Sequence, residues 1–249
     1  GLYVLEKKNQ TWVLKNKING FENSSKHVVL AKNKIFVNHE YKGVFKIYVD
    51  KNYKEATKVV KDTSLEKGIN SSIIEYQNKI LYASKKGVFV YDEGKDLFKK
   101  DLVYSSLIDS YNFISANLIH DPVKNRLWSF SKEQIKYLTP GKLSNKPKVT
   151  SISISEHIPK AVSGYENITY LEHQKYLIGT SDGFIQMDLN SLKNPTNFKV
   201  HINKVNSFKL DEIKNSVDLT VVNEFDNTEN NIELLFSTPN FNNIFENSA

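Results

Sequence analysis

The sequence predicts an all-β protein: a β-propeller of four full four-stranded blades plus part of a fifth, followed by the start of a β-sandwich. Three observations lead to this prediction. A sequence pattern recurs every 45 to 49 residues, the segments within it are rich in Val, Ile, Tyr and Phe and bounded by Asn, Lys, Asp and Gly, and no helical periodicity lasts three turns. Four short antiparallel strands in about 45 residues are typical of a propeller blade.

Each repeat consists of a polar pair, a short apolar strand, a tight polar turn and a second strand. We expect these hairpins at residues 33–50, 78–93, 125–138 and 174–189. The opening GLYVLE matches the second half of the pattern, so we expect it to be a strand of a preceding blade. Further strands are expected on both sides of each hairpin, for example at 72–76 and 97–103 around the second one.

Glycines occupy the same place in three of the four hairpins, at Gly43, Gly87 and Gly183. A short hairpin demands a positive φ at such a position, and glycine adopts it without the steric cost of a Cβ. We therefore predict positive φ at all three glycines. The third repeat has Glu133 and Gln134 instead, so its hairpin is expected to turn differently.

Charge divides the chain into two parts. Residues 1–100 carry a net charge of +9 and residues 101–200 a net charge of +2, whereas residues 201–249 carry −5. Such a reversal can mark a domain boundary. We therefore expect a partial propeller over 1–200 and, over 201–249, an acidic β-sandwich with strands at 217–222 and 232–236. A complete sandwich has about 100 residues, so we expect this chain to be a fragment of a longer protein.

Composition excludes several classes of function. The chain has no cysteine, which removes disulfides, thiolate metal sites and thiol nucleophiles. Of its 34 basic residues only Arg126 is an arginine, which disfavours a nucleic-acid surface. No apolar run approaches the ~18 residues of a membrane span. The six histidines show no metal spacing, and no phosphate loop or nucleophile elbow is present. We predict no catalytic residues, no metal ligands and no cofactor.

The tip of the first hairpin holds the candidate ligand-binding residues His39, Tyr41 and Lys42. A metalloprotease motif would need a histidine at position 43, where the chain has Gly43. Turns at blade ends line the faces and the channel mouth of a propeller, so these side chains are placed to touch a ligand or a partner. The simpler alternative is an exposed polar turn.

Other residues that suggest chemistry have structural explanations. His120, Asp121 and Pro122 are better explained as a turn between two strands than as a catalytic pair. Trp128 is expected in the core of a blade rather than on a sugar-stacking surface. Asp182, next to Gly183, is expected to be a turn residue.

Five segments carry a resemblance to a known family. They are HEYKGVFKIYVD (39–50), YLTPGKLSNKPKV (137–149), GYENITYL (164–171), YLIGTSDGFIQMDL (176–189) and NNIELLFSTPNF (230–241). With these segments the chain resembles the periplasmic sensor region of Bacteroidetes membrane-spanning regulators, the two-component-type propeller proteins that carry a three-tyrosine domain. It looks like the subgroup that ends in a LuxR-type helix-turn-helix, and a histidine-kinase output is the nearest variant.

The resemblance implies a periplasmic sensor module of an inner-membrane transcriptional regulator. It makes residues 201–249 the truncated start of an immunoglobulin-like three-tyrosine domain. The expected partner is a small-molecule or glycan signal, and a homodimer through the propeller edges or the immunoglobulin-like domain is expected. The tyrosine triplet, the membrane helix and the DNA-binding helix of the family are absent from these residues, so this chain is expected to bind no nucleic acid.

Two other functions fit the residues. The chain could be a protein-interaction propeller, whose sheet edges and turns dock other chains. It could also be a propeller glycan hydrolase or lyase, in which carboxylates far apart in sequence converge in space. The leading hypothesis is a sensor that is not an enzyme.

Overall fold

The computed structural model describes residues 1–31, 34–141, 147–154, 161–192, 200–210, 213–218, 220, 225, 227 and 230–237. The chain divides into two compact units, residues 1–190 (unit 1) and residues 191–249 (unit 2). Both consist of antiparallel β-sheets, and the described residues contain a single short helix. The prediction of an all-β protein is therefore confirmed.

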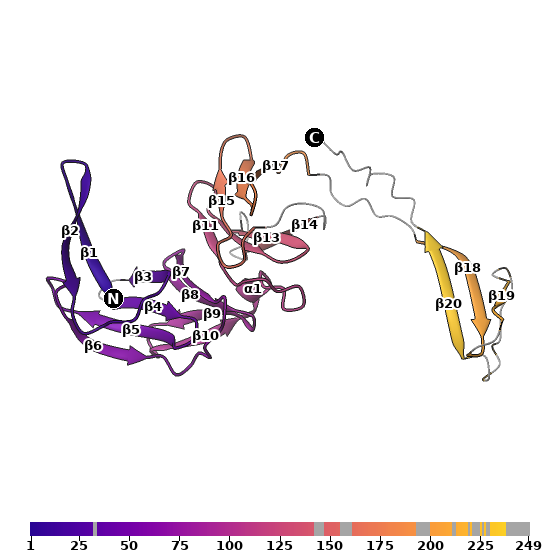
Figure 1. Ribbon diagram of the computed structural model, residues 1–249, viewed down its shortest axis with the longest axis horizontal. Coiled ribbons are helices and arrows are strands. Elements are labelled where there is room, and N and C mark those ends of the chain that lie inside the picture. Colours follow the sequence, from indigo (N-terminus) through magenta and orange to yellow (C-terminus); the bar gives the residue numbers. More distant parts are fainter. Residues whose placement is uncertain are drawn as a thin grey trace. The chain divides into compact units, whose positions relative to one another are not determined.

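The described part of unit 1 contains five antiparallel sheets, each built from strands that follow one another in the sequence (Figure 1). The strands of the first three sheets are β1 (Leu2–Lys8) and β2 (Thr11–Ile18); β3 (His27–Ala31), β4 (Lys34–His39), β5 (Gly43–Val49) and β6 (Ala56–Lys61); and β7 (Ser72–Tyr76), β8 (Lys79–Ser84), β9 (Gly87–Asp92) and β10 (Leu97–Asp101). Those of the other two are β11 (Ile119–Asp121), β12 (Arg126–Phe130), β13 (Gln134–Thr139) and β14 (Lys148–Ser153); and β15 (Ile168–Tyr170), β16 (Lys175–Gly179) and β17 (Phe184–Asp188).

Two details depart from the expected pattern of strands. The strand expected at 97–103 ends at Asp101, because the Asp101 carboxylate accepts hydrogen bonds from the backbone N–H groups of Val103 and Tyr104 and so caps the helix α1 (Leu102–Ser105). The sheet β15–β17 has three described strands. A fourth strand would fall near residues 193–199, which lie outside the described residues.

The hairpins of unit 1 turn in two different ways. Gly43 and Gly87 have φ values of 96° and 120°, as predicted, and a Cβ at Gly87 would lie 2.7 Å from Ser105 Oγ. The prediction for Gly183 is wrong, because its φ is not positive. In that hairpin the Thr180 N–H donates to the Gly183 oxygen at 2.9 Å, and Ser131 and Gln134 make the same bond in the third hairpin. This backbone bond closes the turn without requiring a left-handed residue.

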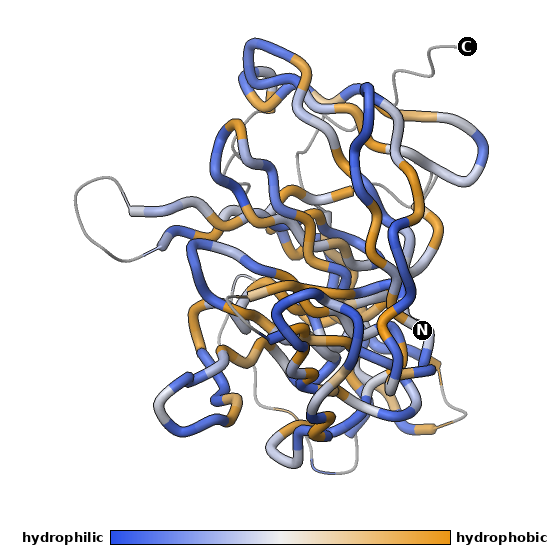
Figure 2. The backbone as a smooth tube through the Cα atoms, turned by 90° about the vertical axis from the view of Figure 1, so that its left-hand side faces the viewer, coloured by the Kyte–Doolittle hydropathy of each residue, from blue (hydrophilic) through white to orange (hydrophobic). Residues whose placement is uncertain are grey.

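Apolar clusters join each sheet of unit 1 to the next one along the chain. Alternating side chains of neighbouring sheets interdigitate, as expected for stacked pleated surfaces. The clusters contain Ile18, Phe21, Ile35, Val37 and Ile47; Val29, Phe36, Ile73 and Tyr82; Tyr76, Leu81, Leu127 and Leu138; and Trp128, Phe130, Tyr176 and Ile178. Trp128 is fully buried, which confirms its predicted place in the core. Figure 2 shows hydrophobic and hydrophilic stretches alternating along the backbone.

Hydrogen bonds also connect four successive sheets near the segments that lead into their first strands. All four acceptors are backbone oxygens. Asn38 Nδ2 donates to that of Ser71 at 3.0 Å, and Ser72 Oγ donates to that of Ala116 at 2.6 Å. Asn117 Nδ2 donates to that of Glu166 at 3.1 Å, and Lys26 Nζ donates to that of Gly164 at 3.3 Å. These bonds run from the sheet β3–β6 through the next two sheets to the loop before β15, and then back to β3. They bring together loops that are far apart in the sequence.

Unit 2 has one three-stranded antiparallel sheet in its described residues, in the order β19-β18-β20. Its strands are β18 (His201–Phe208), β19 (Asn215–Val217) and β20 (Asn231–Ser237). The strand expected at 232–236 lies within β20. The strand expected at 217–222 overlaps β19 only at Val217, and residues 219, 221 and 222 lie outside the described residues. Among the helical residues that the structure describes, none form a helix long and apolar enough to cross a membrane.

Candidate functional site

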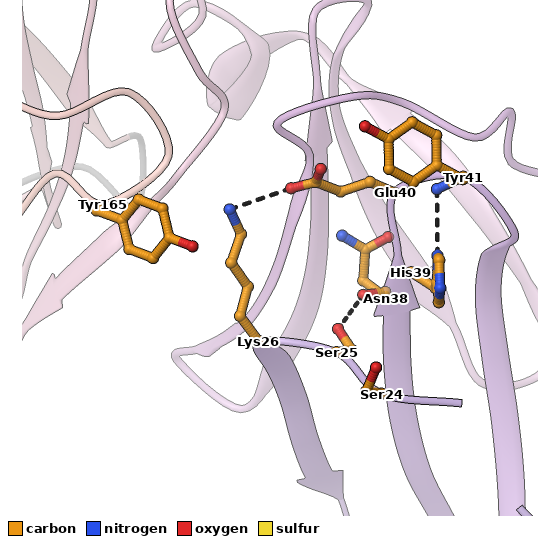
Figure 3. A pocket seen from close by; sticks show the side chains of 8 residues that line it. All are labelled: Ser24, Ser25, Lys26, Asn38, His39, Glu40, Tyr41 and Tyr165. Atoms are coloured by element: carbon orange, nitrogen blue, oxygen red, sulfur yellow. Dashed lines mark hydrogen bonds and ion pairs between the residues drawn. The ribbon is translucent and has the colours of Figure 1, made fainter. Parts of the chain in front are cut away.

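A cavity of about 380 Å³ lies at the tip of the β4–β5 hairpin (Figure 3). We call it the first cavity. Three segments form it: residues 24–26 before and at the entry to β3, residues 38–41 at the end of β4, and Tyr165 in the loop before β15. Its volume is within the range of about 300–1,000 Å³ that is usual for small-molecule sites.

Buried hydrogen bonds fix the floor of the first cavity. Asn38 is 2% exposed, and its Nδ2 donates to both the backbone oxygen and the Oγ of Ser71 at 3.0 Å. Ser25 Oγ donates to the Asn38 backbone oxygen and accepts the His27 N–H at 3.1 Å. Because these polar groups are paired within the protein, the cavity is formed before any ligand enters it.

Lys26 lines the first cavity and contacts three groups. Its Nζ is 3.1 Å from Glu40 Oε1, 3.3 Å from the Gly164 oxygen to which it donates, and 4.7 Å from the centre of the Tyr165 ring. Figure 3 shows the ammonium group between the Tyr165 ring and the Glu40 carboxylate. Glu40 Oε1 is buried and makes no hydrogen bond to a described residue, so the ion pair with Lys26 is its compensation.

Two exposed tyrosine rings flank this ion pair. Tyr41 is 65% exposed and Tyr165 is 67% exposed, and they come from different sheets. The Tyr41 N–H donates to His39 Nδ1 at 3.2 Å, and the two side-chain rings meet edge to face at 6.3 Å between centroids. The histidine therefore holds the tip of the hairpin, and the Tyr41 ring remains open to solvent.

The structure brings together two of the three residues predicted from the sequence. His39 and Tyr41 line the first cavity, whereas Lys42 does not and instead donates to Asn23 Oδ1. Neither Lys26 nor Tyr165 was predicted at this site, because Lys26 and Gly164 are 138 positions apart in the sequence. Their proximity depends on how the loops that enter different sheets meet in space, and no local sequence pattern indicates this.

The charge near the first cavity affects one histidine. Burial lowers the pKa of His27, the neighbouring Lys26 ammonium lowers it further, and Glu40 acts in the opposite direction. The imidazole of His27 is therefore neutral at neutral pH. The ion pair of Lys26 and Glu40 remains the charged feature of the cavity wall.

The first cavity has the chemistry of a binding site for a polar molecule with apolar faces. Exposed tyrosine rings can stack on the C–H face of a ring, while the carboxylate, ammonium and serine hydroxyl groups supply donors and acceptors. Glu40 is the single carboxylate in its described lining, whereas glycoside hydrolysis uses two. Within the described residues, no group of three or more His, Asp or Glu side chains could hold a metal ion.

Asp121 and Asp182, the other acidic residues considered from the sequence, lie outside the first cavity. Asp121 Oδ1 accepts the Val123 and Lys124 N–H groups, as a turn residue does, and Asp121 Oδ2 accepts the Tyr176 hydroxyl at 2.7 Å. Asp182 Oδ1 accepts the Thr180 hydroxyl at 3.1 Å within the β16–β17 turn. Neither carboxylate lines the first cavity.

Comparisons with known proteins give distant structural similarities. No protein-family model matches the chain, and no curated protein matches it at a significant level. The chain is similar to the extracellular domain of a B. thetaiotaomicron protein described as a hybrid two-component system, with 14% identity and a TM-score of 0.46 over 67% of this chain and 22% of that one. A second structure of the extracellular domain of the same B. thetaiotaomicron protein, described there as a one-component system, has 14% identity and a TM-score of 0.43 over 70% of this chain and 24% of that one.

A third similar structure is an auxiliary nutrient-binding protein from Bacteroides ovatus, with 12% identity and a TM-score of 0.41 over 72% of this chain and 49% of that one. The chain therefore spans less than half of the length of the chain in each of these three structures. Likeness at this level assigns no activity, ligand or partner to the chain.

Proposed function

We propose that this chain is the ligand-binding part of an extracytoplasmic sensor and that the first cavity binds a small polar molecule of the saccharide class. The observation that carries the proposal is the pair of exposed rings, Tyr41 and Tyr165, on either side of the Lys26–Glu40 ion pair. Exposed aromatic rings beside polar groups form an amphipathic surface that suits a ligand with both apolar and polar faces.

Saccharides match this combination of groups. A pyranose ring has an apolar C–H face for each tyrosine and hydroxyl groups around its edge. Glu40 can accept from those hydroxyls, and Lys26 can donate to them. Hydrogen bonds to charged groups are stronger than those between neutral groups, so the ion pair favours a neutral polyol without requiring a charged ligand.

We further propose that the five sheets of unit 1 are blades of a propeller and that unit 2 contains the start of an immunoglobulin-like three-tyrosine domain. The packing of successive sheets and the resemblance of five sequence segments support this assignment. With that resemblance, the proposed setting is the periplasmic side of a membrane-spanning transcriptional regulator of the LuxR-type subgroup, which acts as a homodimer. Ligand binding would then favour one arrangement of the sensor over another.

One observation favours the alternative of a protein-interaction scaffold. The sheet β1–β2 has an exposed apolar face that contains Tyr3, Leu5, Trp12 and Leu14, each more than half exposed. A face of this kind is typical of a surface that another chain covers. A hydrolase or lyase is less favoured, because the described lining of the first cavity provides one carboxylate.

Calorimetric titration of the full chain with neutral mono- and oligosaccharides tests the proposal. We expect at least one saccharide to bind, and we expect Tyr41→Ala and Tyr165→Ala each to weaken that binding by about tenfold, since a stacked aromatic ring contributes about 1–1.5 kcal/mol. Tyr111→Ala is the matched control, because Tyr111 is 96% exposed and lies outside the lining of the first cavity. Absence of binding across a broad panel would contradict the proposal.

A further inference from the structure

A second cavity, of about 560 Å³, lies at the corresponding place on the next sheet. It is formed by the loop that enters β7 (residues 66–70), the turn between β8 and β9 (residues 84–86), and residues 113–114 before β11. The first cavity is likewise built from the loop that enters β3 and the turn between β4 and β5. The two cavities nevertheless differ in their side chains.

The rim of the second cavity is positively charged. Lys67, Lys85 and Lys86 line it together with Glu66, so the rim carries an excess of two positive charges. Lys86 Nζ donates to Glu66 Oε2 at 2.5 Å, and both side chains are exposed. In the part of the chain that the structure describes, Lys67 and Lys85 make no salt bridge.

Apolar side chains also line the second cavity. Ile69 is 62% exposed, and Phe113 and Ile114 line the same cavity. The Lys85 ammonium lies 6.0 Å from the centre of the Phe113 ring, so charged and apolar lining groups are neighbours. An apolar surface beside lysine ammonium groups suits a ligand that has an apolar body and one negatively charged end.

Hydrogen bonds hold the second cavity in shape. Asn70 Nδ2 donates to the Ile114 backbone oxygen at 3.0 Å, and the Asn70 backbone oxygen accepts the Ala116 N–H at 2.8 Å. Asn70 Nδ2 also reaches Ser163 Oγ at 3.3 Å, while Lys26 of the first cavity donates to the neighbouring Gly164. Ser163 thus contacts the lining of the second cavity and Gly164 that of the first. The two cavities share no described lining residue.

We propose that the second cavity binds an organic carboxylate with an apolar body. The carboxylate would contact the free ammonium groups of Lys67 and Lys85, and the body would cover Ile69 and Phe113. Removing this apolar surface from water favours binding in proportion to its area, and the two cations select an anion. The proposal rests on these residues alone and does not depend on saccharide binding at the first cavity.

Calorimetric titration of the full chain with three probes tests this proposal: 4-phenylbutyrate, its neutral amide and inorganic sulfate. We expect the carboxylate to bind, and the amide and sulfate each to bind at least tenfold more weakly. Lys67→Ala and Lys85→Ala should each weaken carboxylate binding by about threefold, as for an exposed charge contact. Lys51→Ala is the matched control, because Lys51 is exposed and lies outside both cavities.

Any of four results would overturn the proposal. Two are equal affinity for the acid and its amide, and equal affinity for the acid and sulfate. The others are unchanged acid binding in the Lys67→Ala/Lys85→Ala double variant, and no measurable binding of the acid at millimolar concentration. Tyr165→Ala should leave carboxylate binding unchanged, and the lysine variants should leave saccharide binding unchanged. Failure of one site is therefore distinguishable from failure of the other.

Discussion

Lys26 Nζ lies 3.1 Å from the Glu40 carboxylate and donates to the backbone oxygen of Gly164 at 3.3 Å. One side chain thus connects the entry of β3, the β4–β5 turn and the loop before β15. These three segments are the ones that form the first cavity. The contact that links the loops therefore also shapes the candidate binding site.

Lys26→Ala removes the contacts of this side chain with Glu40, the Gly164 oxygen and the Tyr165 ring. The Lys26 and Glu40 side chains are 33% and 19% exposed, so water partly screens the pair, but Glu40 Oε1 is buried and loses its cation. We expect the free energy of unfolding to fall by about 1–2 kcal/mol. We expect the affinity for a saccharide to fall as well, because the loop that carries Tyr165 loses its anchor. Urea unfolding followed by tryptophan fluorescence measures the first effect, since Trp12 and Trp128 both lie in unit 1. Unchanged stability and unchanged affinity together would contradict this role of Lys26.

Gly164→Ala tests the backbone of the same loop. Gly164 has a φ of 76°, and a Cβ there would lie 2.9 Å from Lys26 Nζ. The ammonium can move aside, so the main cost is the left-handed conformation, about 1–2 kcal/mol. Gly94→Ala is the matched control: Gly94 is not among the residues with positive φ, and the nearest atom to its Cβ would be 3.5 Å away. If both variants show the same urea midpoint, the strain argument is wrong.

Lys46 on β5 makes a buried ion pair with Asp62 at 3.2 Å, and both residues are 3% exposed. Lys46 also reaches Asp96, which follows β9 in the next sheet, at 3.1 Å. Burial acts to lower the pKa of Lys46, but the hydrogen bonds to Asp96 and Asp62 outweigh it and raise the pKa. Because Lys46→Met leaves Asp62 buried without its cation, we expect a loss of about 3–5 kcal/mol in the free energy of unfolding.

An exposed ion pair provides the control for Lys46. Lys99 lies 2.8 Å from Asp92, with side chains 51% and 32% exposed. Lys99→Met should therefore cost less than about 1 kcal/mol. Equal losses for Lys46→Met and Lys99→Met in urea unfolding would show that burial does not decide the strength of these pairs.

His27 should make the stability of unit 1 depend on pH. Its pKa in the folded protein is lowered, chiefly by burial, from the ordinary value of 6.5. The unfolded chain therefore binds a proton at a higher pH than the folded one does, so stability is highest above pH 6.5 and falls as the pH drops toward the lowered pKa. His27→Gln removes this contribution.

Thermal unfolding between pH 5 and pH 8 measures the effect of His27. The melting temperature of the unmodified protein should fall more steeply below pH 6.5 than that of His27→Gln. His173→Gln is the control, because the His173 side chain is 81% exposed. Parallel pH profiles for His27→Gln and the unmodified protein would contradict the prediction.

The repeat pattern was sufficient to predict the hairpins, because alternating apolar residues and polar turns determine a strand pair locally. Local hydrogen bonds explain the two errors of the prediction, one at the end of β10 and one at Gly183. Residues 102 and 103 were expected within a strand, but the Asp101 carboxylate caps a helical turn that begins at Leu102. Gly183 resembled Gly43 and Gly87, yet a backbone bond between Thr180 and Gly183 closes that turn without a positive φ.

Contacts between sheets could not be predicted in the same way. Arg126, the one arginine, donates to the Tyr176 hydroxyl at 2.6 Å and to Gln174 at 2.7 Å, and its guanidinium lies 4.9 Å from the centre of the Tyr137 ring. This site needs a planar cation with several donors, which lysine cannot supply. Composition marked Arg126 as unusual, but its partners depend on how two sheets pack. The same holds for Tyr165 and Lys26 in the first cavity.

Saturation-transfer difference NMR of the full chain with a bound oligosaccharide detects whether the two tyrosine rings hold a sugar. We expect strong saturation of the C–H protons on the faces of one sugar ring, because the Tyr41 and Tyr165 rings stack on them. We also expect the signal to disappear in the Tyr41→Ala/Tyr165→Ala double variant and to persist in Tyr111→Ala. Undiminished saturation in the double variant, or no saturation by any saccharide in the panel, would contradict the claim that these two tyrosines form a saccharide site.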